Sequence, residues 1–188
     1  MLIQVLAILS AAAAGGMRIA IPLLLIGLVH IDKLWSDIPI LSLIQPQIVV
    51  GILTSWSLLE LFGTKQFMSL RILQIIQLVF SPLAGGLLAV GVTKLLKAEL
   101  SPLWLIGIVG GALALVLKFV QVGWFFRLKG IPMAFIFIQD LLAVVLVLFA
   151  LKAPENGGLI AMLLLWIALR SSTQWRRWYL QKEKKFKS

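Results

Sequence analysis

Long apolar segments separated by short polar stretches make up most of this chain. They cover about residues 2–30, 47–63, 70–93, 102–126, 131–151 and 159–178. At about 1.5 Å per residue, segments of this length match a hydrocarbon core of about 30 Å. No run of alternating apolar and polar residues indicates a strand. The pattern predicts an all-α membrane protein, a six-span transmembrane helix bundle over residues 1–180, followed by a basic tail over 181–188.

Two of the predicted spans contain residues that interrupt helices. The first would make a helix of roughly 42 Å, so it must tilt, protrude or break. Gly15, Gly16 and Pro22 are the expected break there, and Ser81 with Pro82 interrupts the third span. A cleaved signal peptide is a competing interpretation of the first segment, although its basic n-region is missing.

Four charged residues lie inside these apolar segments: Arg18, Glu60, Lys118 and Asp140. A charge near the middle of a bilayer costs about 2.5–3.5 kcal/mol on insertion scales, so such residues usually face a bundle interior and a partner. Lys118 and Asp140 lie at matching depth in spans joined by a short turn, which predicts an ion pair. A second pair between Arg18 and Glu60 is the weaker expectation. The pairs either fix helix register or form a transport or binding site.

The two halves of the chain share a pattern. Each opens with a Gly-Gly pair, carries a cation in its first span and an acid in its second. Three spans per half would invert the second half relative to the first, as in many carriers, so a weak 3+3 inverted repeat is predicted. The spacings differ, however, with 42 residues from Arg18 to Glu60 and 22 from Lys118 to Asp140.

Charge gives the predicted topology. Of the 188 residues, 61% are hydrophobic and 13% charged, yet the net charge is +10. Seven of the 17 basic residues lie after Leu169, in the last part of the final span and in the tail. Such a run is typical of a cytoplasmic tail against anionic lipid rather than of a nucleic-acid site. The positive-inside rule then places the C terminus, and with six spans the N terminus, in the cytoplasm. Gly107, Gly111 and Ala114 form a small-residue face for close helix packing.

The chain shows no catalytic constellation. It has no cysteine, which excludes disulfides, thiolate nucleophiles and Cys-ligated metals. His30 is the only histidine and lies at a predicted membrane boundary. No metal-ligand spacing, phosphate-binding loop or nucleophile with a base is present. We therefore expect no enzyme activity, no metal and no cofactor.

Four stretches resemble a bacterial family of integral membrane proteins, common in cyanobacteria, catalogued as a domain of unknown function (number four-one-two-six). They are AAAAGGMRIAIPLLLIGLV at 11–29, LLELFGTK at 58–65, IQLVFSPLAGGLLAV at 76–90 and QDLLAVVLVLFAL at 139–151. The resemblance implies a compact multi-span domain with signature positions at Arg18, Pro22, Glu60, Pro82 and Asp140. Gln139 stands where the family commonly has a second acid, which weakens any proton-relay role. The family name carries no activity.

The leading hypothesis is a carrier for a small solute, an ion or a lipid-like molecule, with its site at the four buried charges. The alternatives are a structural or assembly subunit of a larger membrane complex, and a membrane ligand-binding subunit of a transporter. The expected partners are the lipid bilayer, anionic lipid at the tail, and further copies or other subunits, but no nucleic acid. A bacterial cytoplasmic or thylakoid membrane is the expected location.

Overall fold

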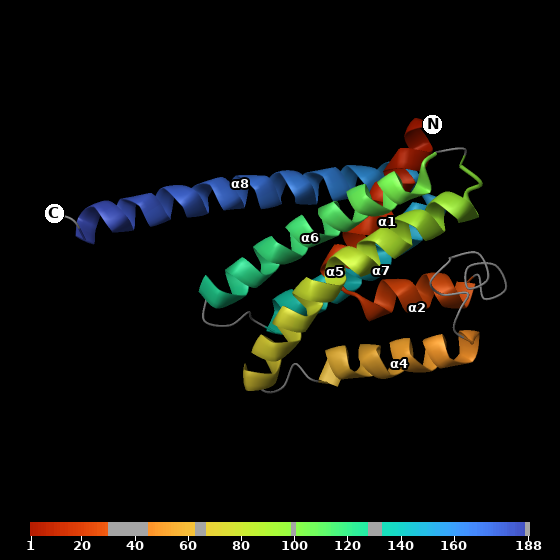
Figure 1. Ribbon diagram of the computed structural model, residues 1–188, viewed down its shortest axis with the longest axis horizontal. Helices are drawn as coiled ribbons and strands as arrows, with labels where there is room; N and C mark the ends of the chain where they lie inside the picture. Colours follow the sequence, from red (N-terminus) through yellow and green to blue (C-terminus); the bar gives the residue numbers. More distant parts are fainter. Residues whose placement is uncertain (30–44, 63–66, 99–100, 128–132, 187–188) are drawn as a thin grey trace.

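The computed structural model describes residues 1–29, 45–62, 67–98, 101–127 and 133–186, and their secondary structure is entirely helical (Figure 1). The predicted all-α class is confirmed. The helices are α1 (Leu2–Met17), α2 (Ala20–Val29), α4 (Pro46–Phe62), α5 (Phe67–Leu95), α6 (Leu103–Arg127), α7 (Met133–Lys152) and α8 (Pro154–Phe186).

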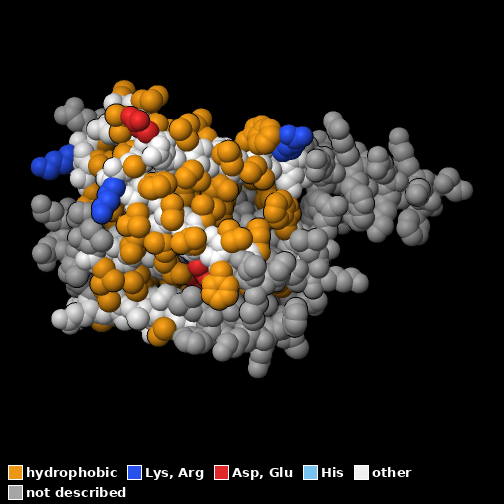
Figure 2. All heavy atoms as spheres, turned by 180° about the vertical axis from the view of Figure 1, so that it is seen from behind, with side chains coloured by type: hydrophobic (Ala, Val, Ile, Leu, Met, Phe, Trp, Pro, Cys, Tyr) orange, Lys and Arg blue, Asp and Glu red, His pale blue; other side chains and the backbone are white. Residues whose placement is uncertain are grey.

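Three of these helices are long and apolar enough to cross a membrane: Ile72–Leu95 in α5, Leu103–Phe125 in α6 and Phe135–Lys152 in α7. The six-span prediction is therefore wrong for the described residues, where α1 and α4 are shorter apolar helices. Apolar side chains cover much of the described part of the face drawn in Figure 2, and Phe137 and Leu141 are about two-thirds exposed, at 68% and 66%. An apolar patch of this extent is unfavourable in water. The chain is a membrane-embedded protein.

The first predicted span is instead two helices that meet inside the bundle. Helix α1 ends at Met17, Arg18 has an extended backbone (φ −139°, ψ 149°), and α2 starts at Ala20. Figure 1 shows α1 running inward from the N terminus and α2 running back toward the same end. The first segment is therefore two helices that turn back at Arg18, called the re-entrant pair below, rather than one continuous helix over 2–30.

The break lies just after the glycine pair rather than at it. Gly15 and Gly16 both belong to α1. Pro22 is the third residue of α2, in the first turn, where backbone N–H groups have no intrahelical acceptor and a missing one costs little. Arg18 therefore sits at the tip of the re-entrant pair.

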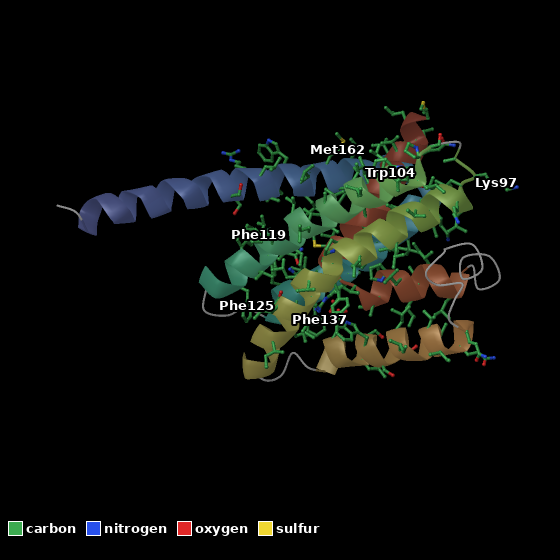
Figure 3. All side chains as sticks on the ribbon, viewed as in Figure 1. Lys97, Trp104, Phe119, Phe125, Phe137 and Met162 are labelled. Atoms are coloured by element: carbon green, nitrogen blue, oxygen red, sulfur yellow. The ribbon has the colours of Figure 1, made fainter. Side chains whose placement is uncertain are left out.

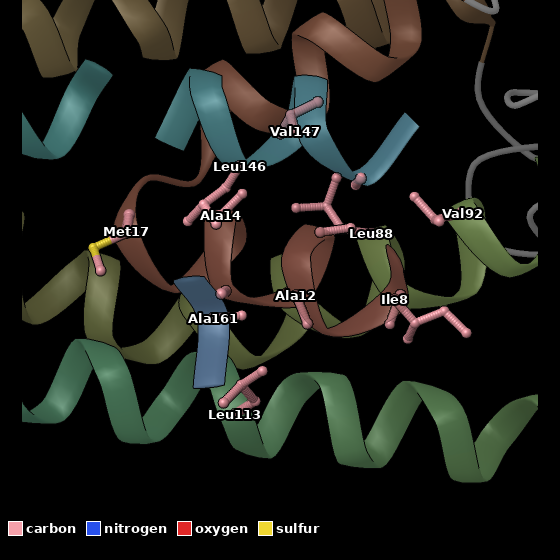
Figure 4. Close-up of a cluster of buried hydrophobic side chains, with 14 of the residues drawn as sticks. Ile8, Ala12, Ala14, Met17, Leu88, Val92, Leu113, Leu146, Val147 and Ala161 are labelled. Atoms are coloured by element: carbon pink, nitrogen blue, oxygen red, sulfur yellow. The ribbon is translucent and has the colours of Figure 1, made fainter. Parts of the chain in front are cut away.

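Helix α1 forms the centre of the bundle and packs against α5, α6, α7 and α8 (Figure 4). Ala11, Ala12, Ala13 and Ala14 are completely buried. A Cβ added at Gly16 would lie 2.9 Å from the Ala114 backbone. Small side chains let the helices around α1 approach closely. In lipid, apolar side chains gain little by leaving the bilayer, so close packing contacts between helices hold the bundle together.

The predicted small-residue face of α6 packs closely against α5. A Cβ on Gly111 would lie 2.7 Å from the Pro82 carbonyl oxygen, and one on Gly85 would lie 2.3 Å from the Ala114 Cβ. Backbones at this separation leave no room for larger side chains. The prediction of a close helix interface at Gly107, Gly111 and Ala114 is confirmed.

Helix α5 continues through Ser81 and Pro82, so the predicted interruption there is wrong. The Ser81 hydroxyl lies 3.4 Å from the Gly15 carbonyl oxygen and 3.2 Å from the Ala114 carbonyl oxygen, contacting α1 and α6. Helix α6 likewise continues through its own glycine pair, whereas α1 ends shortly after Gly16. The first helices of the two halves thus differ, which argues against a 3+3 repeat.

The two chain ends lie at opposite ends of the bundle, and α8 extends well beyond it (Figure 1). A Cβ on Gly158, near the start of α8, would lie 2.5 Å from the Leu6 side chain, so α8 begins beside the outer half of α1. Which side of the membrane each terminus faces stays a prediction. Trp104 and Phe125 lie toward opposite ends of α6 (Figure 3); Trp104 is exposed, as expected for a tryptophan near a membrane interface, whereas Phe125 is buried.

Candidate functional site

The tip of the re-entrant pair carries a buried ion pair. Arg18 is 4% exposed and its Nε contacts the Asp140 Oδ1 of α7, which is 15% exposed. The Arg18 backbone N–H donates to the Ala14 carbonyl at 3.0 Å, closing the last turn of α1. Non-helical backbone at membrane depth is tolerated where protein surrounds it or it lines a cavity. Arg18 meets the first of these conditions.

A second pair of opposite charges is joined through an amide. The Lys118 ammonium donates to Gln77 Oε1 at 2.5 Å, and Gln77 Nε2 donates to Glu60 Oε1 at 2.8 Å. The Trp56 indole N–H donates to the same Glu60 oxygen at 3.1 Å. Lys118, Gln77 and Glu60 are each at least 98% buried. The Gln77 amide thus connects the Lys118 ammonium to the Glu60 carboxylate, which do not contact each other directly.

The structure brings all four predicted charges into one neighbourhood, because Lys118 is close enough to Arg18, Glu60 and Asp140 to interact electrostatically with each. Two cations and two anions make the cluster neutral. The partners differ from those predicted: Asp140 pairs with Arg18 rather than with Lys118, and Glu60 pairs with neither cation directly.

The position of α1 explains the different pairing. The short connection between α6 and α7 predicted adjacent helices, but α1 packs against both and separates them. Asp140 on α7 therefore meets the residue at the end of α1. Lys118 on α6 meets Gln77 on α5, which packs against both α6 and α1.

Two acceptor atoms near this cluster have no hydrogen-bond partner. They are Glu60 Oε2 and Gln74 Oε1, and both are buried. Gln74 precedes Gln77 by three residues, so the two share a face of α5. An unpaired buried acceptor costs free energy, and buried carboxylates usually have partners. The site has unused capacity to accept a proton, a cation or a donor group.

The glutamines of α5 belong to the candidate site but are not among the residues predicted from the sequence. The prediction rested on charges within apolar segments and did not include uncharged polar residues there. Gln74 and Gln77 in a span of apolar neighbours were the available signal, since a buried amide also requires partners.

Within the part of the chain that the structure describes, no group of three His, Cys, Asp or Glu residues could hold a metal ion. His30 lies outside the described residues, as do the side chains of the basic tail.

Fold and site together define a class: a helical membrane-embedded protein with a neutral cluster of buried charges at a re-entrant helix tip. A family model for the domain of unknown function DUF4126 matches residues 5–174, and the chain belongs to this family. The match spans every residue of the cluster. Neither curated proteins nor solved structures gave a match.

Proposed function

We propose that the protein is a carrier that binds a small solute or ion at the buried charge cluster and passes it across the membrane. The observation that carries this proposal is Glu60 Oε2, a carboxylate oxygen that is buried and has no hydrogen-bond partner. Buried ionisable groups in membrane proteins commonly mark substrate and ion pathways. Broken helices at the binding site are a recurring feature of carriers, and the break at Arg18 supports the same proposal.

The free atoms favour a positively charged or hydrogen-bond-donating substrate. Both unpaired groups, Glu60 Oε2 and Gln74 Oε1, are acceptors. A small cation, a proton or a donor-rich solute would satisfy them, whereas an anion would meet carboxylate repulsion. Lys118 and Arg18 already have partners, at Gln77 and Asp140 respectively.

Gln77 is the residue that we expect to move when the substrate binds. Its side chain is neutral and hydrogen-bonds to both Glu60 and Lys118. A substrate that binds Glu60 therefore replaces one hydrogen bond from the Gln77 amide without leaving a charge unpaired. Pro82 follows five residues later in α5 and lacks the N–H that would bond to the Leu78 carbonyl. A helix weakened at this point can shift Gln77 relative to α6.

Flux measurements in proteoliposomes test the proposal. Purified protein is reconstituted, and the movement of H⁺, Na⁺, K⁺ and small cationic solutes is followed with fluorescent reporters. We expect a flux that falls at least tenfold in Glu60→Gln and in Lys118→Met, while Glu155→Gln, which alters an exposed acid in the first turn of α8, keeps the full rate. Equal rates in all four proteins, each eluting as a folded species from size exclusion, would overturn the carrier proposal.

A role as an assembly subunit is the second candidate, supported by the length of α8. This helix extends beyond the bundle, and its sequence becomes basic after Leu169 (Figure 1). A projecting basic helix suits docking to another subunit or to anionic lipid at the cytoplasmic surface of a bacterial membrane. Purification in mild detergent separates the two roles: a stoichiometric protein partner supports assembly, and a homogeneous single species supports the carrier.

A further inference from the structure

A cavity of about 250 Å³ lies where the end of α1 meets α6, α7 and α8. Its walls are mainly apolar, and they include Met17, Val120, Trp124, Ile138 and Leu164. An apolar cavity of about 150 Å³ in another protein is large enough to bind benzene. The present cavity has room for a larger molecule.

One polar group in the wall has an unused hydrogen-bonding atom. Gln121 is 93% buried, its Nε2 lies 2.7 Å from the Met17 sulfur, and its Oε1 has no hydrogen-bond partner. Leaving such an acceptor buried and unpaired is unfavourable. A ligand with a donor group would remove that cost.

We infer that this cavity binds an uncharged, mainly apolar molecule that carries a hydroxyl group. No charged residue is among those that line the cavity, so a charged ligand would lose its hydration without gaining a counter-ion. A hydroxyl donates to Gln121 Oε1 while the apolar body contacts Trp124 and Leu142. Ligand pockets commonly combine apolar walls with a few polar groups that fix orientation in this way.

The geometry also gives the route of entry. Ile138 on α7 and Ile167 on α8 both line the cavity, yet they are 58% and 38% exposed. The cavity therefore opens between α7 and α8 toward the surface that faces lipid, and a ligand enters sideways from the bilayer. None of the four charged residues of the cluster lines the cavity, although Met17, Leu117 and Gln139, which do, each precede one of them in the chain. The inference does not depend on whether the protein is a carrier.

Photolabelling of the reconstituted full-length protein tests this inference. The probe is 1-octanol carrying a diazirine, the matched probe is the corresponding octane without a hydroxyl, and labelled residues are identified by mass spectrometry. We expect saturable labelling of the cavity wall at Ile138, Leu142 and Leu164. Half-saturation should need about tenfold less of the octanol probe than of the octane probe, because only octanol pairs with Gln121.

Three variants make the result specific. Gln121→Leu should bind both probes equally, and its retained octane labelling shows that the cavity remains folded. Ala168→Phe, which fills the cavity from α8, should remove saturable labelling of both probes, whereas Leu141→Phe on the exposed face of α7 should change neither. Labelling that never saturates, spreads equally to Phe137 and Leu141, or keeps its hydroxyl preference in Gln121→Leu would overturn the inference.

Discussion

Asp140→Asn is expected to lower the free energy of unfolding by about 3–5 kcal/mol, the usual cost of removing one partner from a buried ion pair. Arg18 is 4% exposed, and its guanidinium would keep its charge without a carboxylate to balance it. This loss is a large fraction of a typical free energy of unfolding, which is about 5–15 kcal/mol. Unfolding in mixed micelles, followed by tryptophan fluorescence, measures the change.

The double variant Arg18→Met with Asp140→Leu distinguishes a lost ion pair from general damage. Replacing a buried pair with apolar residues of similar size is often neutral or stabilising, so we expect most of the lost stability to return. Glu155→Gln is the control for removing an acid at an exposed position and should change stability by about 1 kcal/mol or less. Asp140→Asn with the stability of the parent would show that the ion pair does not hold α7 to the tip of α1.

Gln77→Leu is expected to have the second largest effect, a loss of roughly 3–6 kcal/mol. Its amide makes one hydrogen bond to Lys118 and one to Glu60, and each bond to a charged group contributes about 1.5–3 kcal/mol. A leucine of similar size fills the space but satisfies neither charge. The same unfolding measurement detects the loss.

The control for Gln77→Leu is Gln47→Leu, at an exposed position of α4. We expect that change to be within about 0.5 kcal/mol, as for most surface substitutions. Combining Gln77→Leu with Lys118→Met and Glu60→Leu removes both stranded charges and should restore stability. If the single and triple variants are equally unstable, the loss arises from packing rather than from unpaired charge.

The sequence was sufficient to identify the four charges but not their partners. Arg18, Glu60, Lys118 and Asp140 stand out because charge inside an apolar segment is expensive and requires neutralisation. Pairing depends on which helices are adjacent, and we inferred adjacency from the short connection between α6 and α7. Helix α1 packs against both helices, and no local pattern in the sequence indicates that it does.

The hydropathy pattern also could not predict that the first segment turns back on itself. A span and a pair of half-length helices both require apolar residues throughout, so length alone favours the span. The four consecutive alanines of α1 were the better signal, since a helix buried on all sides by other helices needs small side chains. Helix α2 has no such run.

The prolines indicated roughly where a helix could be interrupted, but not whether it is interrupted there. Pro22 lies near a real break but belongs to the first turn of the next helix, and Pro82 lies within a continuous helix. Proline removes one backbone hydrogen bond, and neighbouring helices decide whether the chain bends there. The small-residue face of α6 was predictable because its purpose, close packing, depends on the residues themselves.

The absence of cysteine allows one direct test of the re-entrant path that carries Arg18 to Asp140. Single cysteines at Leu2, Lys152 and Ser172 are labelled with a membrane-impermeant maleimide in intact cells and in inside-out vesicles. Ser172 is exposed on α8, next to Ser171, which contacts Trp124 near the end of α6. We predict that Leu2→Cys and Lys152→Cys react from the same side of the membrane, and Ser172→Cys from the other. Reaction of Leu2→Cys and Ser172→Cys from one side would show that the first segment crosses the membrane and would contradict the account.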